Sequence, residues 1–250
     1  MAHFYKPDGT FVDGLREARK CNALPSPSTV LGLMKGQGLI EYFKRQVFEA
    51  TATTPRRPEW TDDEYYEAVI KWSEEHAQTA RDKGGDFHSL VQAFHKSCIM
   101  QGPRPFVPPD LSGQYDAYLA WYENAVEKTL LVEEVVMGKG YGGRVDHVCR
   151  LKDGRLAVCD PKTQGLSAKK KKFSCYTNWA LQLGAYWGGT WIAGLQPDVL
   201  ISICVSSGDG PVQLEAYEWP KDPDYYHQLF LGLLAIWREE NNYDPEKPLL

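Results

Sequence analysis

The chain has 250 residues, of which 43% are hydrophobic and 24% are charged. This length favours one domain with embellishments, and this composition excludes disorder, collagen-like repeats or a coiled coil as a description of the whole chain. The longest apolar stretch, Leu229–Trp237, has nine residues, whereas a helix that crosses a membrane needs about 20. Residues Met1–Lys6 lack the apolar core of a signal peptide. We therefore expect a cytoplasmic protein with no membrane partner.

The net charge is −5, but the basic residues are unevenly distributed. The segment from Arg144 to Lys172 contains nine Lys and Arg residues and three Asp residues, a balance of +6, so the rest of the chain carries −11. A basic island on an acidic protein predicts a local anionic ligand rather than a surface that coats DNA.

The six cysteines are Cys21, Cys98, Cys149, Cys159, Cys175 and Cys204. No two of them are spaced as C-x-x-C, so a zinc or iron–sulfur site has no local support in the sequence. In a chain without a signal peptide we expect free, mostly buried thiols rather than disulfides.

The first 130 residues are expected to be mostly helical. Residues 1–27 hold the turn signals Asp8-Gly9 and Asp13-Gly14, so we expect loops there. Thr61 followed by three acids is typical of a helix N-terminus, and Gly84-Gly85 is expected to end that helix. The predicted helices of this half cover Val30–Met34, Leu39–Ala50, Thr61–Arg81, Phe87–Cys98 and Gln114–Leu130.

The second half predicts a sheet, because short runs of β-branched and aromatic residues alternate with turn signals. The predicted strands are Leu131–Val136, Gly143–Leu151, Leu156–Thr163, Val199–Val205 and Leu214–Trp219, and the predicted helices are Tyr176–Ile192 and Tyr225–Glu240. The first three strands form an antiparallel meander. We therefore predict one α/β domain, residues 1–250, with a helical part at 1–130, a sheet core at 131–220 and a closing helical part at 221–250.

Two acids and a lysine, Asp146, Asp160 and Lys162, lie on adjacent predicted strands inside otherwise apolar runs. A two-residue loop between these strands would turn Asp146 away from Asp160, whereas a three-residue loop places them directly opposite. Gly154 suits the left-handed position of the three-residue loop, so we predict that register. Lys162 then shares the face of Asp160, because side chains two residues apart on a strand point the same way.

Two facing carboxylates repel each other, which raises the pKa of one of them. A divalent cation removes this repulsion, and carboxylate oxygens suit Mg²⁺ or Mn²⁺. A nearby ammonium such as that of Lys162 stabilises charge that develops on a phosphate. These groups are a minimal set for hydrolysis of a phosphodiester. The alternative interpretation is a surface hairpin with an ordinary Asp–Lys ion pair.

Four short motifs follow one another along the chain: Gly84–His88, Gly143–Asp146, Asp160–Thr163 and Gln182–Tyr186. Their order resembles the PD-(D/E)XK nuclease superfamily, and within it the RecB-like exonuclease branch, over the region 84–190. Ser26–Leu31 also resembles the helix start, rich in Ser and Thr, of some members, including the mitochondrial genome maintenance exonucleases. The resemblance implies a restriction-endonuclease-like core, in which an antiparallel meander and a further strand are flanked by helices.

The resemblance also implies roles for single residues. The implied metal ligands are His88, Asp146, Asp160 and the backbone carbonyl of Pro161, and the implied catalytic residues are Asp146, Asp160, Lys162, Gln182 and Tyr186. Relatives rarely carry proline between the acid and the lysine. Because proline lacks a backbone donor, we expect the strand to be unpaired, splayed or bulged at Pro161. The cysteine triplet that closes an iron–sulfur cluster in some relatives is absent from the sequence, so we expect no cluster.

Four further residues near the predicted site have expected positions. His95 lies seven residues after His88, and we predict a structural role for it. His147 follows Asp146 on a strand and should point to the opposite face. Glu133 and Glu134 precede the site, where one of them either reaches the metal through water or is exposed to solvent.

We expect a Mg²⁺- or Mn²⁺-dependent hydrolase, a DNA exonuclease that processes DNA ends or single strands in recombination or repair. The residues expected to contact DNA phosphates are Ser167, Lys169, Lys170, Lys171 and Lys172. One alternative is a structure-specific or nicking endonuclease of the same fold. A second is a nucleic-acid-binding module without activity, against which the intact set of two aspartates and a lysine argues.

Overall fold

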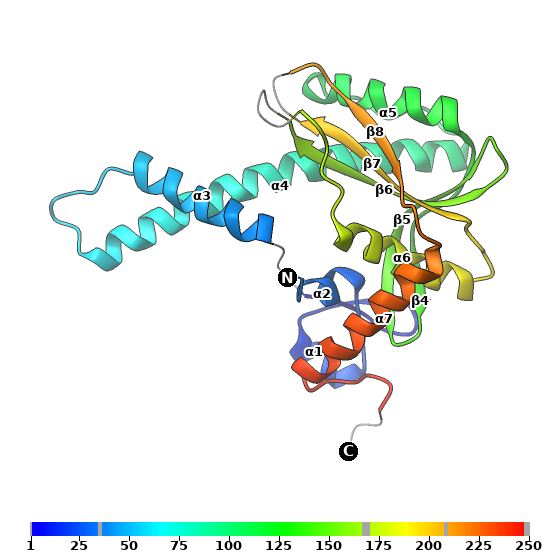
Figure 1. Ribbon diagram of the computed structural model, residues 1–250, viewed down its shortest axis with the longest axis horizontal. Helices are drawn as coiled ribbons and strands as arrows, with labels where there is room; N and C mark the ends of the chain where they lie inside the picture. Colours follow the sequence, from blue (N-terminus) through cyan, green and yellow to red (C-terminus); the bar gives the residue numbers. More distant parts are fainter. Residues whose placement is uncertain (1, 35–36, 167–170, 208–209, 248–250) are drawn as a thin grey trace. The chain divides into compact units, whose positions relative to one another are not determined.

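Figure 1 presents the computed structural model, which describes residues 2–34, 37–166, 171–207 and 210–247. By its internal contacts the chain divides into two compact units, one formed by Met1–Leu33 and Phe87–Leu250 and the other by Met34–Asp86. The larger unit contains the sheet and all the described candidate site residues. No helix in the described part of the chain is long and apolar enough to cross a membrane.

A five-stranded sheet forms the centre of the larger unit, in the order β4-β5-β6-β7-β8. Its strands are β4 (Val126–Gly138), β5 (Tyr141–Leu151), β6 (Leu156–Gly165), β7 (Val199–Ser207) and β8 (Leu214–Glu218). The β6–β7 pair is parallel and the other pairs are antiparallel. The predicted α/β class, the antiparallel meander and all five strands are confirmed. The first strand begins earlier than predicted, so the helix expected to reach Leu130 ends at Ala125.

Helices cover both faces of this sheet (Figure 1). One face packs against α5 (Ser112–Ala125), a 3₁₀ turn (Pro109–Leu111) and the last part of α4 (Asp62–Met100). The other face packs against α6 (Thr177–Ile192), which in turn contacts α7 (Pro223–Glu240). The core of the first face contains Phe87, Val91, Phe94, Leu111, Tyr115, Tyr118, Cys149, Cys159, Ile201 and Ile203. These apolar side chains fix α4 and α5 against the back of the strands that carry the site.

The hairpin between β5 and β6 has the predicted register. The Leu151 N–H donates to the Arg155 carbonyl at 2.8 Å, and Gly154 has φ +92°, the left-handed conformation that the three-residue loop requires. The ladder continues to His147, which pairs with Cys159. The next positions along the two strands are Asp146 and Asp160, which therefore come opposite each other.

The N-terminal 27 residues differ from the prediction of loops. They form a three-stranded sheet of order β2-β1-β3, with β1 (His3–Tyr5), β2 (Phe11–Asp13) and β3 (Leu24–Pro25), together with α1 (Leu15–Cys21). The Asp8-Gly9 turn lies between β1 and β2, and each strand is too short to show a clear alternation in the sequence. The helix α2 (Pro27–Leu31) starts earlier than predicted, because Ser26 caps it by accepting from the Thr29 N–H at 3.1 Å.

The smaller unit contains α3 (Gln37–Thr53) and the first part of α4. Thr61 and Glu64 form a capping box: the Glu64 N–H donates to Thr61 Oγ1 at 3.3 Å, and the Thr61 N–H donates to Glu64 Oε2 at 2.8 Å. The predicted break at Gly84-Gly85 is wrong, since α4 continues through both glycines. A glycine costs a helix about 1 kcal/mol relative to alanine, and the buried side chains that follow, such as Phe87 and Val91, offset this cost.

Candidate active site

The candidate site lies where β5 and β6 part. The last paired residues of their ladder are His147 and Cys159. The first positions beyond them are Asp146 on β5 and Asp160 on β6. Pro161 follows Asp160 on β6, and β5 no longer pairs with β6 there. The predicted loss of pairing at Pro161 is therefore present toward β5. On the β7 side the expectation is wrong, because β6 pairs with β7 from Ala157 to Gly165 without a shift and Pro161 lies opposite Ile203.

A chain of polar contacts joins β6 to α6. The Lys162 ammonium lies 2.5 Å from Asp160 Oδ2, as expected for side chains on one face of a strand. The same ammonium donates to Gln182 Oε1 at 3.1 Å, and Gln182 Nε2 donates to the Tyr186 hydroxyl at 3.1 Å. Lys162 also lies 5.8 Å from the centre of the Trp179 ring. These contacts hold the amine beside the carboxylate, and they use the two α6 residues singled out in the sequence.

His88 reaches the two aspartates from α4. Its Nε2 lies 3.3 Å from Asp146 Oδ1 and 3.9 Å from Asp160 Oδ1. His88 is not at a helix start, as the motif suggested, but inside α4. Asp160 shares with Lys162 the face of β6 that α6 covers, on the other side of the sheet from α4. His88 Nε2 comes within 3.9 Å of Asp160 at the point where the β5–β6 ladder has ended.

Glu133 is a further residue at the site, and the sequence left it undecided. Ligand atoms of His88, Glu133 and Asp146 all lie within 4.8 Å of one another. Glu133 has φ +54°, and the β4–β5 ladder has no rung between the Val132 and Glu134 pairs. The backbone of a residue other than glycine is strained in this conformation, and such strain is concentrated at functional sites. The backbone conformation turns Glu133 toward the site while Glu134 is exposed, and no sequence signal distinguishes the two.

The two carboxylates occupy different electrostatic environments. Burial and then the Asp160 carboxylate raise the pKa of Asp146 to about 7. Burial also disfavours the charge on Asp160, but Lys162 and His88 outweigh it and hold the pKa of Asp160 below its ordinary value. The pKa of His88 is raised, because Asp160 and Asp146 outweigh the effect of its burial. Without a cation, the site therefore supports one negative carboxylate far better than two.

The donor set fits a hard divalent cation. Asp146 Oδ2 and Asp160 Oδ1 are buried and have no hydrogen-bond partner among the described residues. A buried carboxylate oxygen without a partner is costly. Carboxylate oxygens with one imidazole nitrogen, from His88, suit Mg²⁺ or Mn²⁺. Pro161 is buried between the acid and the lysine, and the role of its carbonyl stays a prediction.

A cavity of about 550 Å³ borders the site on the side of the N-terminal sheet. Its lining includes His3, Tyr5, Ser26, Ser28, Gly143, Arg144 and Tyr186. The Ser26–Leu31 motif and the Gly143–Asp146 motif are far apart in the sequence, but this cavity brings them together. It offers hydroxyl groups and one guanidinium next to Tyr186, which contacts Gln182.

The basic run lies only partly within the described residues. Lys171 and Lys172 are exposed in the connection between β6 and α6. Ser167, Lys169 and Lys170 lie outside the described residues. Gln164 holds Ser174, near the end of this connection, through two hydrogen bonds. Its Nε2 donates to the Ser174 carbonyl at 2.6 Å, and its Oε1 accepts from the Ser174 N–H at 3.0 Å.

His95 and His147 lie in the core on the α4 face, so that His147 points to the face opposite Asp146, as predicted. Their rings stack at 3.7 Å, and His95 Nε2 lies 3.0 Å from the Tyr118 hydroxyl. Burial lowers the pKa of His147 to about 3, and burial followed by His147 holds the pKa of His95 well below its ordinary value. Both rings are therefore neutral, and neither touches the aspartates.

No family model matches this sequence, and no curated protein matches it. Among solved structures, the crystal structure of a protein named SSO0001 is similar at a TM-score of 0.30 and 15% sequence identity, over 81% of this chain and 87% of that one. Similarity at this level assigns neither a fold family nor an activity to the chain.

Proposed function

We propose that this protein is a metal-dependent DNA exonuclease with the restriction-endonuclease-like core of the PD-(D/E)XK nucleases. The observation that carries the proposal is the grouping of His88, Asp146, Asp160 and Lys162 at one point of the sheet, with buried carboxylate oxygens that lack partners among the described residues. An ordinary surface ion pair would not bury a second aspartate beside the first.

His88, Asp146 and Asp160 would hold Mg²⁺ or Mn²⁺, with Glu133 and the Pro161 carbonyl as further ligands. When bound, the cation supplies Lewis acidity and lowers the pKa of water, which is the chemistry that phosphodiester hydrolysis needs. The two aspartates that would hold it come one from β5 and one from β6. Their negative charge is what the cation would compensate.

Lys162 has two tasks in this proposal. Its ammonium orients a water or a phosphate oxygen, and it offsets negative charge that develops on the phosphate. Gln182 holds this ammonium at 3.1 Å, and Tyr186 holds Gln182. Gln182 and Tyr186 are thus positioning residues that keep Lys162 over the reacting group.

The cavity beside the site supports a phosphate-bearing substrate such as DNA. Arg144 and the exposed Ser28 in its lining can bind a phosphate. Exposed Lys171 and Lys172 add positive charge along the connection to α6. None of these groups forms a base-reading helix or ribbon, so we propose action without sequence specificity.

The second candidate is a structure-specific or nicking endonuclease with the same core. The same metal ligands and lysine would serve both reactions, so the substrate that is cut distinguishes them. The test is cleavage of 5′-labelled linear single-stranded DNA, linear duplex DNA and closed circular DNA with Mg²⁺, with Mn²⁺ and with EDTA. The exonuclease proposal expects progressive shortening of linear DNA only, and the order of labelled products gives the polarity.

Cutting of closed circles would replace the exonuclease by the endonuclease. If folded protein cuts no substrate with either metal, the site is a binding surface and the proposal is wrong. The Gln182→Leu variant sharpens this test, since it removes a contact of Lys162 while leaving every proposed metal ligand in place. We expect its cleavage rate to fall about 10-fold with little change in the metal concentration required.

A further inference from the structure

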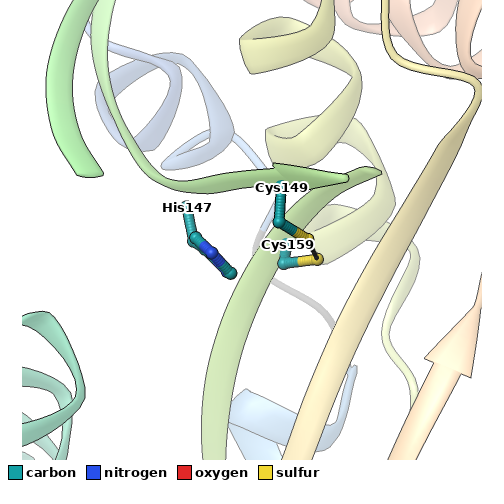
Figure 2. A group of neighbouring side chains, drawn as sticks. All are labelled: His147, Cys149 and Cys159. Carbon is teal, nitrogen blue, oxygen red and sulfur yellow. Dashed lines mark hydrogen bonds between the residues drawn. The ribbon is translucent and has the colours of Figure 1, made fainter. Parts of the chain in front are cut away.

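A second cluster of ligating side chains lies on the opposite face of the same two strands. His147 and Cys149 come from β5 and Cys159 comes from β6 (Figure 2). All three side chains are fully buried. One nitrogen of His147 and the two sulfur atoms lie within 4.8 Å of one another. In the ladder Cys159 pairs with His147 and Cys149 pairs with Ala157, so the two thiols meet diagonally across the strands.

The separation of the two sulfur atoms fits a shared metal ion. Cys149 Sγ and Cys159 Sγ lie 3.8 Å apart, and Figure 2 draws them pointing toward each other. Zinc binds thiolate at about 2.3 Å in a tetrahedral arrangement, which separates two sulfur ligands by about 3.8 Å. A disulfide needs the same atoms at about 2.05 Å. The two thiols therefore lie at the spacing of a zinc pair without any shift of the strands.

One ring nitrogen of His147 has no hydrogen-bond partner among the described residues. Its Nε2 lies 3.1 Å from the Thr129 hydroxyl, which also lies 2.8 Å from the Tyr122 hydroxyl. Its Nδ1 is buried and has no hydrogen-bond partner among the described residues. A histidine that binds a metal through one nitrogen has the other nitrogen fixed by a hydrogen bond. Thr129 provides that second contact here, and buried nitrogen atoms without a partner are rare.

We infer that His147, Cys149 and Cys159 form a buried zinc site, which is separate from the proposed nuclease site and does not depend on it. Two thiolates and an imidazole suit a soft cation rather than Mg²⁺. Binding releases the two thiol protons to solvent, so that a divalent ion is neutralised by the two thiolates, as a site with no solvent exposure requires. The three side chains leave one tetrahedral position for a small ligand.

Such an ion would fix the distance between β5 and β6 at the end of their ladder. His147 directly follows Asp146, and Cys159 directly precedes Asp160. The zinc site would therefore clamp the strands one residue from each catalytic carboxylate. Sequence spacing alone could not reveal it, because the turn brings the two cysteines together from positions ten residues apart.

The test is metal analysis of the full-length, tag-free protein purified without chelator, followed by replacement of the metal by Co²⁺. We expect one zinc per chain and, with cobalt, the intense near-ultraviolet absorption of a cobalt–thiolate bond. Oxygen and nitrogen ligands do not produce this band, so Co²⁺ at the proposed nuclease site cannot imitate it. Whether the protein cleaves DNA has no bearing on the result.

Two variants test whether this cluster holds the metal. Cys159→Ser should lower zinc retention at least 10-fold and abolish the cobalt–thiolate band. Cys204→Ser is the matched control, because Cys204 is buried to the same extent on β7 and lies outside the cluster, and it should retain both. If Cys159→Ser fails to fold, the wild-type protein decides, because unfolding it in denaturant should release one zinc per chain to a chromogenic chelator, and release of none would overturn the inference.

Three results would overturn the inference. These are a folded wild-type protein that takes up cobalt without a thiolate band, a disulfide between Cys149 and Cys159 in the isolated protein, and retention of copper in place of zinc.

Discussion

Gly143 packs against the ring of Tyr186, and a Cβ at this glycine would come within 2.9 Å of Tyr186 Cε1 and 2.8 Å of Pro27 Cδ. No Cβ is tolerated at such distances unless a neighbour moves. Pro27 is part of α2, and Tyr186 is held by Gln182 on α6. The glycine of the Gly143–Asp146 motif is therefore needed because β5 lies in contact with two other elements at the site.

Gly143→Ala is expected to destabilise the protein by about 1–3 kcal/mol through overpacking, and to reduce cleavage because Tyr186 must move. Urea unfolding measures the first effect. Gly232→Ala is the matched control: Gly232 lies in α7 with nothing within 4 Å of an added Cβ. That control should stabilise the protein by about 0.5–1 kcal/mol. Equal effects of the two substitutions would contradict the packing argument.

Asp146→Asn should abolish cleavage and yet stabilise the metal-free protein. Burial and the facing Asp160 raise the pKa of Asp146 to about 7, so its ionised form opposes folding at neutral pH. In EDTA we expect the variant to be more stable by on the order of 1–3 kcal/mol. Adding Mg²⁺ should raise the melting temperature of the wild type and leave that of the variant nearly unchanged. A less stable variant in EDTA would count against the repulsion between these carboxylates.

Glu133→Gln tests whether the strained residue of β4 belongs to the site. Its ligand atom groups with those of His88 and Asp146, so we expect the Mg²⁺ concentration for half-maximal cleavage to rise about 10-fold or more. Glu134→Gln is the control, because Glu134 is exposed and follows directly on the same strand. If both variants behave like the wild type, Glu133 is not a ligand.

The stacked His95 and His147 predict a component of stability that is lost in acid. Burial lowers the pKa of both, so below about pH 6.5 the unfolded chain binds protons that the folded chain does not. Asp146 acts in the opposite direction, because its raised pKa adds stability as the pH falls. The useful quantity is therefore the difference between wild type and His95→Gln. From pH 7 to pH 5 the wild type should lose up to about 2 kcal/mol more than the variant, and parallel curves would refute this.

The sequence predicted the hairpin of the candidate site well for a physical reason. Both the apolar runs and the turn residues that fix register are local, and Gly154 alone distinguished the three-residue loop from the two-residue loop. Asp146, Asp160 and Lys162 could be placed from that register by counting. His88 could be placed only through the motif, since its contact with Asp146 joins α4 to β5 across 58 positions of the chain.

What the sequence missed depends on tertiary packing. The strands at the N-terminus are two or three residues long and show no period. The helix α4 continues through two glycines because its later residues pack in the core. Glu133 is distinguished from Glu134 by a backbone conformation, and the His147, Cys149 and Cys159 cluster by a diagonal contact between strands. None of these features leaves a local signal.

The most direct test of the account is the metal-dependent cleavage of labelled linear DNA by Lys162→Ala beside Lys152→Ala. Lys162 lies 2.5 Å from Asp160 Oδ2 in the candidate site, whereas Lys152 is an exposed lysine at the turn of the same hairpin. We predict that wild type and Lys152→Ala release nucleotides with Mg²⁺ and not with EDTA, and that Lys162→Ala is slower by about 100-fold or more while it remains folded. Equal rates for the two variants, or cleavage that persists in EDTA, would contradict the proposed active site.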